Sequence, residues 1–564
     1  MIKDTLIKKI DLLRTQLETE RSSFISHWRE LGEYILPVRP RFLHSDTNNG
    51  IKKNSKIINS TATLAARTLR SGMMSGVTSP ARPWFKLGTQ DTELNKLESV
   101  KAWLHDVTQR MAHVFIRSNL YKVLPVLYGD MGVFGTGCMS VEEDFESVVH
   151  FRVYPIGSYM LANDSKDRTR VFIRDFKLTV RQIVEMFAEY DLRKKEYNFK
   201  NISSHIKQLW DTGQKEAWIE VCHAIIPNDA YVPNSQISKN KRFKSVYYER
   251  THGDSYGVLL KESGFDYFQI LAPKWESQVE DSYATDSPGI SSLGYIKQLQ
   301  IMEKRKAQVV EKSVNPPMVA SLSLMNSRTS ILPGDVTYAD ERDGNKAFRS
   351  AHDVTIGTAD IREDIIICED KIKKAFYEDL FLMLSMSDRR QITATEIEMR
   401  HDEKLLALGP VLEHINQDLL DPLIDITFMI MERQGLIPEP PEELQGQELK
   451  VEYVSVMAEA QKLLGTNGVD RFALFAGQSA NINPEVLDKI NFDKMMSDYA
   501  DMLSIPPGII RDDELVAEIR NQRAQAQMAQ QQAELIKQGT ESARNLSSAS
   551  LEGSNVLSQI VGVA

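Results

Sequence analysis

The chain has 564 residues, of which 42% are hydrophobic and 26% are charged, and this predicts a folded protein of several domains because single hydrophobic cores seldom grow past about 300 residues. The net charge of −10 argues against a protein that coats nucleic acid, since such proteins need clustered lysine and arginine. The three cysteines, Cys138, Cys222 and Cys368, lack any C-x-x-C spacing, so they suggest neither a disulfide framework nor a thiolate zinc site, and this fits a reducing cytoplasm.

The first 287 residues combine helical patterns with β-rich segments. Residues 1–35 place apolar side chains at helical spacing with charges mixed among them, which predicts an amphipathic helix and not a secretory leader. Ser60 is the predicted N-cap of a helix that runs through Met74. Further helices are expected at 91–117, 179–190 and 202–212, and short strands with turns between them at 136–178 and 218–270.

From residue 288 onward, helical patterns dominate. A helix from Ile290 to Val314 is expected to stop at Asn315-Pro316-Pro317, because neither proline nor the residue before it continues a helix easily. Residues 318–355 predict strands and loops, and a second helix is expected at about 359–384. Two helices should therefore flank a small β insert.

A long helix is predicted at 393–434. Thr393 and Glu396 form a capping box that fixes its start, and Gly409-Pro410 is expected to kink it because proline removes one backbone donor. The apolar stripe beyond the kink is interrupted by Asp425, so the segment falls short of the roughly 18 consecutive apolar residues of a membrane span. A long, bent and buried helix is the expected result.

The C-terminal region continues with a strand at 449–455 and helices near 456–477 and 484–503. The last helix, about 512–538, is rich in Ala and Gln, which gives good helix propensity but only a weak apolar stripe, so it should need neighbouring copies. Ser, Asn and Gly content predicts a mobile tail at 539–564.

Three patterns suggest chemistry and are better explained by structure. Gly253 to Gly257 matches G-x-S-x-G, which would make Ser255 the nucleophile of a serine hydrolase, but the following residues predict a strand and hence a hairpin turn. The glycines from Gly129 to Gly137 lack a following G-K-[ST] and fit a helix end leading into a strand. His105 and His113 have no further ligand at metal spacing.

Basic clusters occur at Lys304-Arg305-Lys306, at Lys371 with Lys373 and Lys374, and at Arg389-Arg390. Such clusters usually form a solvated helix face or a turn. If copies of the chain formed a ring, these positions could repeat around a bore, where they would touch phosphate without reading bases.

The sequence resembles the head-to-tail connector, or portal, family of short-tailed bacteriophages. The likeness spans about residues 60–455, and its motifs follow the family's order. They are Gly72-Met73-Met74-Ser75-Gly76 running into Thr78 to Phe85, Ser287-Pro288-Gly289 with Leu293 and Ile296 to Leu299, Asn315-Pro316-Pro317 with Pro333-Gly334 and Tyr338, and Thr393 to Ile397 with Arg400, Glu403 and Leu408-Gly409-Pro410.

The resemblance implies a mainly helical α+β fold and a dodecameric ring at one capsid vertex around a DNA channel. The implied regions are a wing at 1–287, stem helices at 288–314 and 359–384, a clip at 315–358, a tunnel loop at 385–392, a long kinked wing helix and wing strand at 393–456, crown or possible barrel helices at 457–538, and a flexible tail at 539–564. No enzyme activity, cofactor or metal is expected.

The resemblance also implies site residues and partners. The candidate residues are Ser387, Asp388, Arg389 and Arg390 in the tunnel loop, Lys304, Lys306, Lys371 and Lys374 on the stem, and Arg328, Asp335, Arg342 and Lys346 in the clip. The expected partners are further copies of the chain, double-stranded DNA without sequence readout, the terminase large subunit, tail adaptor proteins, scaffold and the major capsid protein. The protein is expected in the virion, and in host cytoplasm during assembly.

The Ala- and Gln-rich last helix leaves a second interpretation open, a helical internal scaffold or ejection protein. That interpretation predicts that assembly depends on residues 457–564. A ring built on wing and stem would form without them.

Overall fold

The computed structural model describes residues 2–547 with gaps at 38, 40–54, 92–93, 192–195, 234, 251–256, 278–280, 321, 326–329, 331–347, 351–357, 387–407, 445, 447–448, 455–471, 479–489 and 503–512. The chain divides into two units, Met1–Gln461 and Lys462–Ala564. Helix exceeds strand, 55% against 19%, so the chain is mixed and mainly helical, as the sequence predicts.

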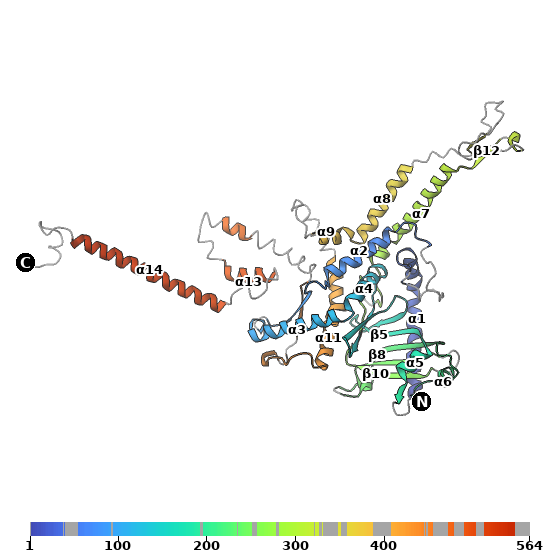
Figure 1. Cartoon of the computed structure of the whole chain (residues 1–564), viewed down its shortest axis with the longest axis horizontal. Helices are drawn as coiled ribbons and strands as arrows, with labels where there is room; N and C mark the ends of the chain where they lie inside the picture. Colours follow the sequence, from blue (N-terminus) through green and yellow to red (C-terminus); the bar gives the residue numbers. More distant parts are fainter. Residues whose placement is uncertain are drawn as a thin grey trace, which may run out of the picture. The chain divides into compact units, whose positions relative to one another are not determined.

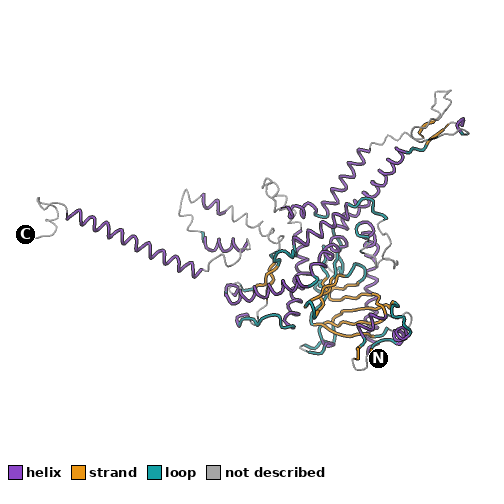
Figure 2. Tube along the Cα trace, viewed as in Figure 1, coloured by secondary structure: helices purple, strands orange, loops and turns teal. Residues whose placement is uncertain are grey.

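A five-stranded antiparallel sheet organises the N-terminal part of the first unit (Figure 2). Its strands, in spatial order, are β10 (Leu259–Phe265), β9 (Phe243–Glu249), β8 (Trp218–Pro227), β5 (Thr169–Thr179) and β4 (Tyr159–Asn163). The two β-rich stretches of the sequence thus meet where β5 pairs with β8. A strand, and not a helix, follows β9, which confirms the predicted hairpin, while Ser255 itself lies outside the described residues.

One long helix, α1 (Ile2–Tyr34), covers one face of this sheet. Ile10 and Leu17 lie on its buried stripe and pack with Cys222 and Val246 of the sheet. Burial of the stripe supplies the stability that a single helix lacks in water. All three cysteines are buried, and none of them forms a disulfide bond.

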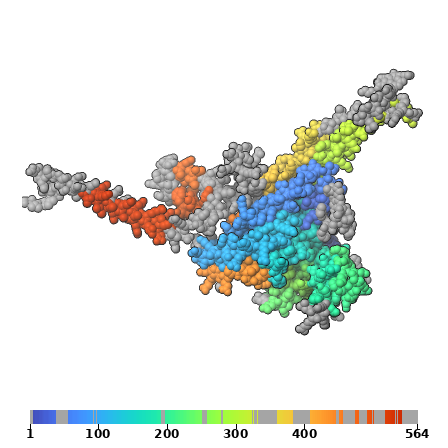
Figure 3. Space-filling model, viewed as in Figure 1, coloured from blue at the N-terminus to red at the C-terminus, as the bar shows by residue number. Residues whose placement is uncertain are grey.

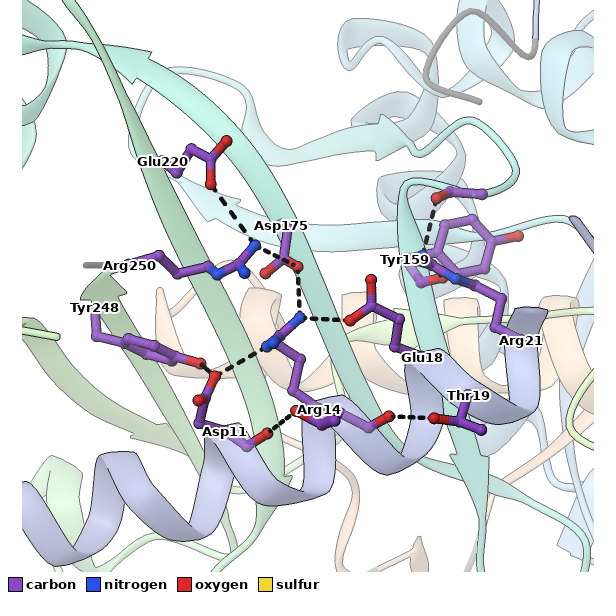
Figure 4. A network of polar contacts seen from close by, with 12 residues as sticks. Asp11, Arg14, Glu18, Thr19, Arg21, Tyr159, Asp175, Glu220, Tyr248 and Arg250 are labelled. Carbon is purple, nitrogen blue, oxygen red and sulfur yellow. Dashed lines mark hydrogen bonds and ion pairs between the residues drawn. The ribbon is translucent and has the colours of Figure 1, made fainter. Parts of the chain in front are cut away.

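A charged network reinforces the contact between α1 and the sheet (Figure 4). The Arg14 side chain is only 8% exposed, and its guanidinium donates to Asp11 at 3.0 Å, Glu18 at 2.9 Å and Asp175 of β5 at 3.2 Å. Arg250 reaches the same Asp175 oxygen at 3.2 Å. A buried cation needs such partners, because an unpaired charge away from water is costly.

Two short helices, α5 (Val180–Phe187) and α6 (Ser204–Asp211), pack with β8 and β10 in a separate apolar cluster beside the β6–β7 ribbon (Glu189–Asp191, Glu196–Asn198). Near this cluster His223 of β8 is buried, with Nε2 3.0 Å from Ser245 Oγ and its ring stacked on Tyr247 at 3.8 Å. Burial, and then the charge of Arg174, lower the pKa of His223 well below its usual value.

Acid is therefore expected to destabilise the sheet through His223. The unfolded chain takes up the proton near pH 6.5 while the folded chain resists it, so stability falls as the pH drops below about 6.5, by up to about 1.4 kcal/mol per pH unit from this group. His223→Gln can keep a hydrogen bond to Ser245 and should have a flatter pH dependence. Denaturant unfolding at several pH values between 7.5 and 4.5 measures this, and identical slopes for both proteins would contradict it.

The main core lies among α2 (Thr61–Gly76), α3 (Glu98–Arg117), α4 (Leu120–Phe134) and a three-stranded sheet of β11 (Ile270–Leu271), β2 (Met139–Asp144) and β3 (Val148–Val153). The helix α4 ends at Phe134, Gly135 follows with φ 84°, and the chain then enters β2. This confirms the helix-to-strand interpretation of the glycine run. Two strands far apart in sequence, β1 (Phe85–Thr89) and β14 (Leu449–Tyr453), pair antiparallel at the edge of this core.

Two helices, α7 (Pro288–Val314) and α8 (Thr358–Ala375), run side by side and join a two-stranded ribbon of β12 (Met318–Ala320) and β13 (Phe348–Ser350) (Figure 1). This confirms the helix–β insert–helix pattern. The expected single helix at 359–384 is wrong, however, because α8 ends at Ala375 and a separate helix, α9 (Glu378–Met386), follows. Tyr377 lies between them with φ 55°, a left-handed conformation that interrupts an α-helix.

The long helix predicted at 393–434 is described only from Leu408, so the Thr393 capping box and the approach to Gly409-Pro410 lie outside the described residues. Residues 408–415 are helical, a π-helical turn occupies Asn416–Leu420, and α11 (Asp421–Arg433) completes the segment. Pro422 in the first turn of α11 has no N–H to continue the α ladder, which accounts for the wider turn before it.

The second unit contains a helix at 472–478, α13 (Phe492–Met502) and α14 (Asp513–Ser547). Arg520 of α14 binds Asp493 of α13 through two bonds of 2.6 and 2.7 Å. The predicted tail boundary after 538 is wrong, since α14 continues to Ser547. Ala543, Arg544 and Leu546 have high helix propensity, which agrees with this continuation.

Candidate channel surface

The helix α7 begins at an anchored site. Ser287 Oγ accepts from the Ile290 amide at 3.2 Å and donates to the Val133 carbonyl of α4 at 3.2 Å. A Cβ on Gly289 would lie 2.4 Å from that same carbonyl oxygen, closer than any side chain could be accommodated without a shift. Ser287-Pro288-Gly289 is therefore a helix cap, a first turn and a close backbone contact in one motif.

A polar clamp lies further along α7. The Gln300 side chain, 5% exposed, accepts from the Ile58 amide at 2.7 Å and the Asn59 amide at 2.9 Å, and donates to the Asn59 carbonyl at 2.9 Å. The Asn59 side chain donates to Glu303 of α7 at 3.2 Å and to Glu369 of α8 at 2.8 Å. One amide thus joins both helices of the pair to the segment before α2.

The same asparagine starts α2. Its Oδ1 accepts from the Thr61 amide at 2.9 Å and from the Thr61 hydroxyl at 2.7 Å. Ser60, the predicted N-cap, occupies the cap position but makes no side-chain cap bond. Asn59 takes over because its longer side chain can reach the helix start and the two carboxylates together.

The helix α2 also contacts α9, the last described helix before residue 387. A Cβ on Gly72 would lie 2.1 Å from Phe381 Cγ, so the absence of a side chain at Gly72 makes room for the phenyl ring. Phe376, at the break before α9, is fully buried, and the Tyr377 ring lies 6.2 Å from that of Trp275. The direction in which α9 leaves α8 is therefore set by packing on both sides of Tyr377.

The four lysines predicted for the stem are all on α7 and α8, but three of them contact other groups within the chain. Lys306 Nζ lies 3.2 Å from Glu303, and Lys374 Nζ lies 2.6 Å from Asp370. The hydrogen bond that Lys374 donates to the Asp370 carboxylate raises the pKa of Lys374. Lys371 Nζ lies 4.8 Å from the centre of the Tyr295 ring, and Lys304 is exposed. Ion pairs of this exposed kind contribute little to stability.

The other candidates lie outside the described residues, namely Ser387, Asp388, Arg389 and Arg390, and Arg328, Asp335, Arg342 and Lys346. Within the part of the chain that is described, no group of three or more His, Cys, Asp or Glu side chains is placed to hold a metal ion. None of the described helices is long and apolar enough to cross a membrane.

Sequence reasoning missed Asn59, Gln300 and Tyr377. Gln300 had a detectable signal, since it is a polar residue that continues the buried positions Ile296 and Leu299 of α7. A polar side chain on a buried face needs a partner there. Neither the partner Asn59 nor the left-handed backbone of Tyr377 has such a signal.

Comparisons with known proteins identify the family to which this chain belongs. The bacteriophage head to tail connecting protein family matches residues 7–510. The chain is 44% identical over 562 residues to the portal protein of Salmonella phage epsilon15, covering 100% of this chain and 98% of that relative. It is 41% identical over 545 residues to the probable portal protein of Bordetella phage BPP-1, covering 97% and 96%. The chain belongs to the family of bacteriophage head to tail connecting proteins.

Proposed function

We propose that copies of this chain close into a dodecameric ring at one capsid vertex, with α7 and α8 around a channel for double-stranded DNA. The family assignment makes the chain a head-to-tail connector. The ring, its vertex and its channel are the proposed details. Packaging, retention and ejection of the genome would all use this one passage.

The ring proposal rests on apolar side chains of α7 and of the residues after it, and in Figure 3 the surface of α7 (green) projects beside that of α8 (yellow) from the rest of the first unit. Several large apolar side chains along this segment are open to solvent in the single chain, and their burial between copies would remove apolar area from water. They include Ile301 at 54%, Val310 at 49%, Val314 at 80%, Leu322 at 89% and Met325 at 80% exposed. Neighbouring copies would cover this surface, as repeated head-to-tail contacts do in a closed ring.

The assignment of the remaining regions is part of the same proposal and uses the bounds that the family resemblance implies. We assign 1–287 and 393–456 to the wing, 288–314 and 359–384 to the stem, 315–358 to the clip, 385–392 to the tunnel loop and 457–538 to the crown. The stem would include the break at Tyr377. Terminase and tail adaptor proteins would bind at the clip, and scaffold and major capsid protein around the wing.

DNA would pass without being held tightly or read. The chain carries a net charge of −10, and three of the four stem lysines are engaged within the chain. A wall with few free cations binds few phosphates, so DNA can move along it. No catalytic role is proposed, since the G-x-S-x-G match lies between two strands of a hairpin.

Electron microscopy of the purified protein tests the ring directly. Closed rings are expected, and monomers alone or open fibres would contradict the proposal. A chain lacking residues 457–564 should still form rings if wing and stem build them. Complete loss of assembly in that truncated chain would favour the helical scaffold or ejection protein instead.

The tunnel loop can be tested separately from assembly. Replacing both Arg389 and Arg390 with alanine is expected to leave rings intact and to impair packaging or retention of DNA, because the cations nearest the phosphates would be removed. Packaged DNA per particle, measured by nuclease protection, reports the effect. The double variant Lys166→Ala, Lys200→Ala removes two exposed cations outside α7, α8 and the tunnel loop and serves as the control. Unchanged packaging in the arginine variant would contradict the proposed role of this loop.

A further inference from the structure

A row of aromatic side chains lies beside the helices α5 and α6. Tyr190 of β6 pairs with Tyr197 of β7, and their ring centres are 5.0 Å apart. Trp210 of α6 continues the row 5.6 Å from Tyr197, and Phe199 lies 6.4 Å from Trp210. Tyr190 is 48% exposed, and the other three rings are half-buried on the apolar cluster of α5 and α6. These four residues are called the aromatic row.

Positive charge is built into the aromatic row. The Lys215 ammonium lies 4.2 Å from the centre of the Trp210 ring, and the Lys207 ammonium lies 5.9 Å from the centre of the Phe199 ring. The acidic residues of the β6–β7 ribbon alternate with its tyrosines, so they point to its opposite face. The row therefore suits a ligand that combines flat apolar groups with carboxylates.

A segment with the complementary chemistry follows α11. Residues 437–443 contain three prolines and three glutamates, and Pro438 to Pro441 form neither helix nor strand. Proline fixes its own φ and favours an extended conformation. The three glutamates are exposed, and within the described part of the chain none of them forms an ion pair. Residues 437–443 are called the acidic proline segment.

The acidic proline segment is held in place at both ends. Before its first glutamate, Trp103 of α3 donates to the Pro438 carbonyl at 3.1 Å. Arg110, also of α3, donates to the Leu436 carbonyl at 3.1 Å. After its last glutamate, Leu444 is buried in the main core. The segment is thus ordered in the single chain and would lose little conformational entropy on binding.

We propose that the acidic proline segment of one copy docks on the aromatic row of the neighbouring copy. This inference rests on the proposed ring. Extended proline-rich segments are recognised by aromatic side chains, and the lysines of the row would face the glutamates of the segment. Because both surfaces belong to this one sequence, a second copy carries the matching surface by necessity.

A chain does not make this contact with itself. Its acidic proline segment is attached to α3, whereas its aromatic row lies on the separate cluster of α5 and α6. Figure 1 shows α11, from which the segment leads, and α6 on opposite sides of the five-stranded sheet. Head-to-tail contacts in a closed ring join two different sides of neighbouring copies. The contact would therefore join the wing of each copy to the wing of the next.

A direct test replaces Tyr190 with the photo-crosslinking amino acid p-benzoylphenylalanine in the full-length chain. Irradiation of purified rings should join chains into a ladder on a denaturing gel, and mass spectrometry should place the attachment within residues 436–443 of another copy. Rings that give no chain-to-chain crosslink, or one that lies elsewhere in the neighbouring copy, would overturn the inference. Crosslinks found only to other proteins in irradiated particles would also overturn it.

An exchange of charges tests the pairing independently. Lys207→Glu with Lys215→Glu should raise the protein concentration needed for half-maximal ring formation by about tenfold or more, because carboxylates would then face carboxylates. Glu439→Lys with Glu442→Lys should have a similar effect. A chain with all four changes should form rings nearly as well as the unchanged chain, since opposite charges face each other again. Failure of the combined variant to improve on the two double variants would contradict the pairing.

Two controls separate the contact from general effects. Glu98→Lys with Glu146→Lys changes the net charge by the same amount as the segment variant, at exposed positions elsewhere, and should leave ring formation unchanged. An equal loss in this control would show that net charge sets assembly and would overturn the inference. Tyr190→Phe should form rings normally and Tyr190→Ser should not, because only the ring is needed for stacking. Equal ring formation by both tyrosine variants would exclude a role for the aromatic row.

The same experiments distinguish this inference from the proposed function. If the unchanged chain forms rings and the charge and tyrosine variants behave like it, only the docking contact fails. If the unchanged chain forms no rings under any condition, the ring proposal fails and the docking contact with it.

Discussion

Gly289→Ala is expected to separate the start of α7 from α4. The new Cβ would lie 2.4 Å from the Val133 carbonyl oxygen and 2.8 Å from Val133 Cα. Both are backbone atoms, which cannot move aside as the end of a flexible side chain can. Overpacking of this kind typically costs about 1–3 kcal/mol or more, and calorimetric or denaturant unfolding of the purified chain measures it.

The same helix offers a matched control. Gly294 has nothing within 4 Å of the position of a Cβ, so Gly294→Ala removes a second glycine from α7 without a clash. Alanine favours helix over glycine by about 1 kcal/mol, and this variant should be neutral or slightly more stable. If both variants shift stability in the same direction by the same amount, helix propensity and not the Val133 contact sets the effect.

Asn59→Asp should loosen the polar clamp between the helix pair and α2. The substitution turns two hydrogen bonds to Glu303 and Glu369 into two repulsions between carboxylates, at an expected cost of about 3 kcal/mol near neutral pH. Repulsion raises the pKa of the folded-state carboxyl groups, so the folded variant binds protons first. Its stability should therefore recover, relative to the unchanged chain, as the pH falls from 7 toward 5.

The pH signature distinguishes the clamp from a general packing defect. Hydrogen exchange of the amides at the start of α2 reports the loosening locally, since Asn59 Oδ1 accepts from the Thr61 amide. The double variant Asn59→Asp, Glu369→Gln should restore much of the lost stability, because an amide again faces a carboxylate. A loss that neither acid nor this second change relieves would exclude the proposed charge repulsion.

The sequence predicted the parts of the fold that depend on local patterns. The end of α7 at Val314 agrees with the expected stop before Asn315-Pro316-Pro317, because proline acts through the backbone alone. The hairpin of β9 and β10 was likewise visible as two β-rich runs around glycines. The motif Ser287-Pro288-Gly289 was recognised by resemblance, and the structure supplies its physical reason.

Features decided by distant contacts were not predictable from single segments. Tyr377 breaks the expected helix where α9 turns to pack on Gly72, a residue some three hundred positions earlier in the chain. The choice of Asn59 over Ser60 as the acceptor for α2 depends on carboxylates from α7 and α8. Neither the break at Tyr377 nor the role of Asn59 produces a local sequence pattern, because tertiary packing outweighs local sequence preferences at both positions.

The pairing of β1 with β14 has a consequence for the order of folding. Phe85 lies opposite Tyr453, so the ribosome must release nearly the whole first unit before β1 can acquire its partner strand. Until then, the edge of β1 stays open and is a template for pairing with other nascent chains. Such a distant contact forms late in folding. Synthesis interrupted before residue 449 should therefore yield aggregation-prone fragments, and the open edge of β1 is covered only when β14 pairs with it.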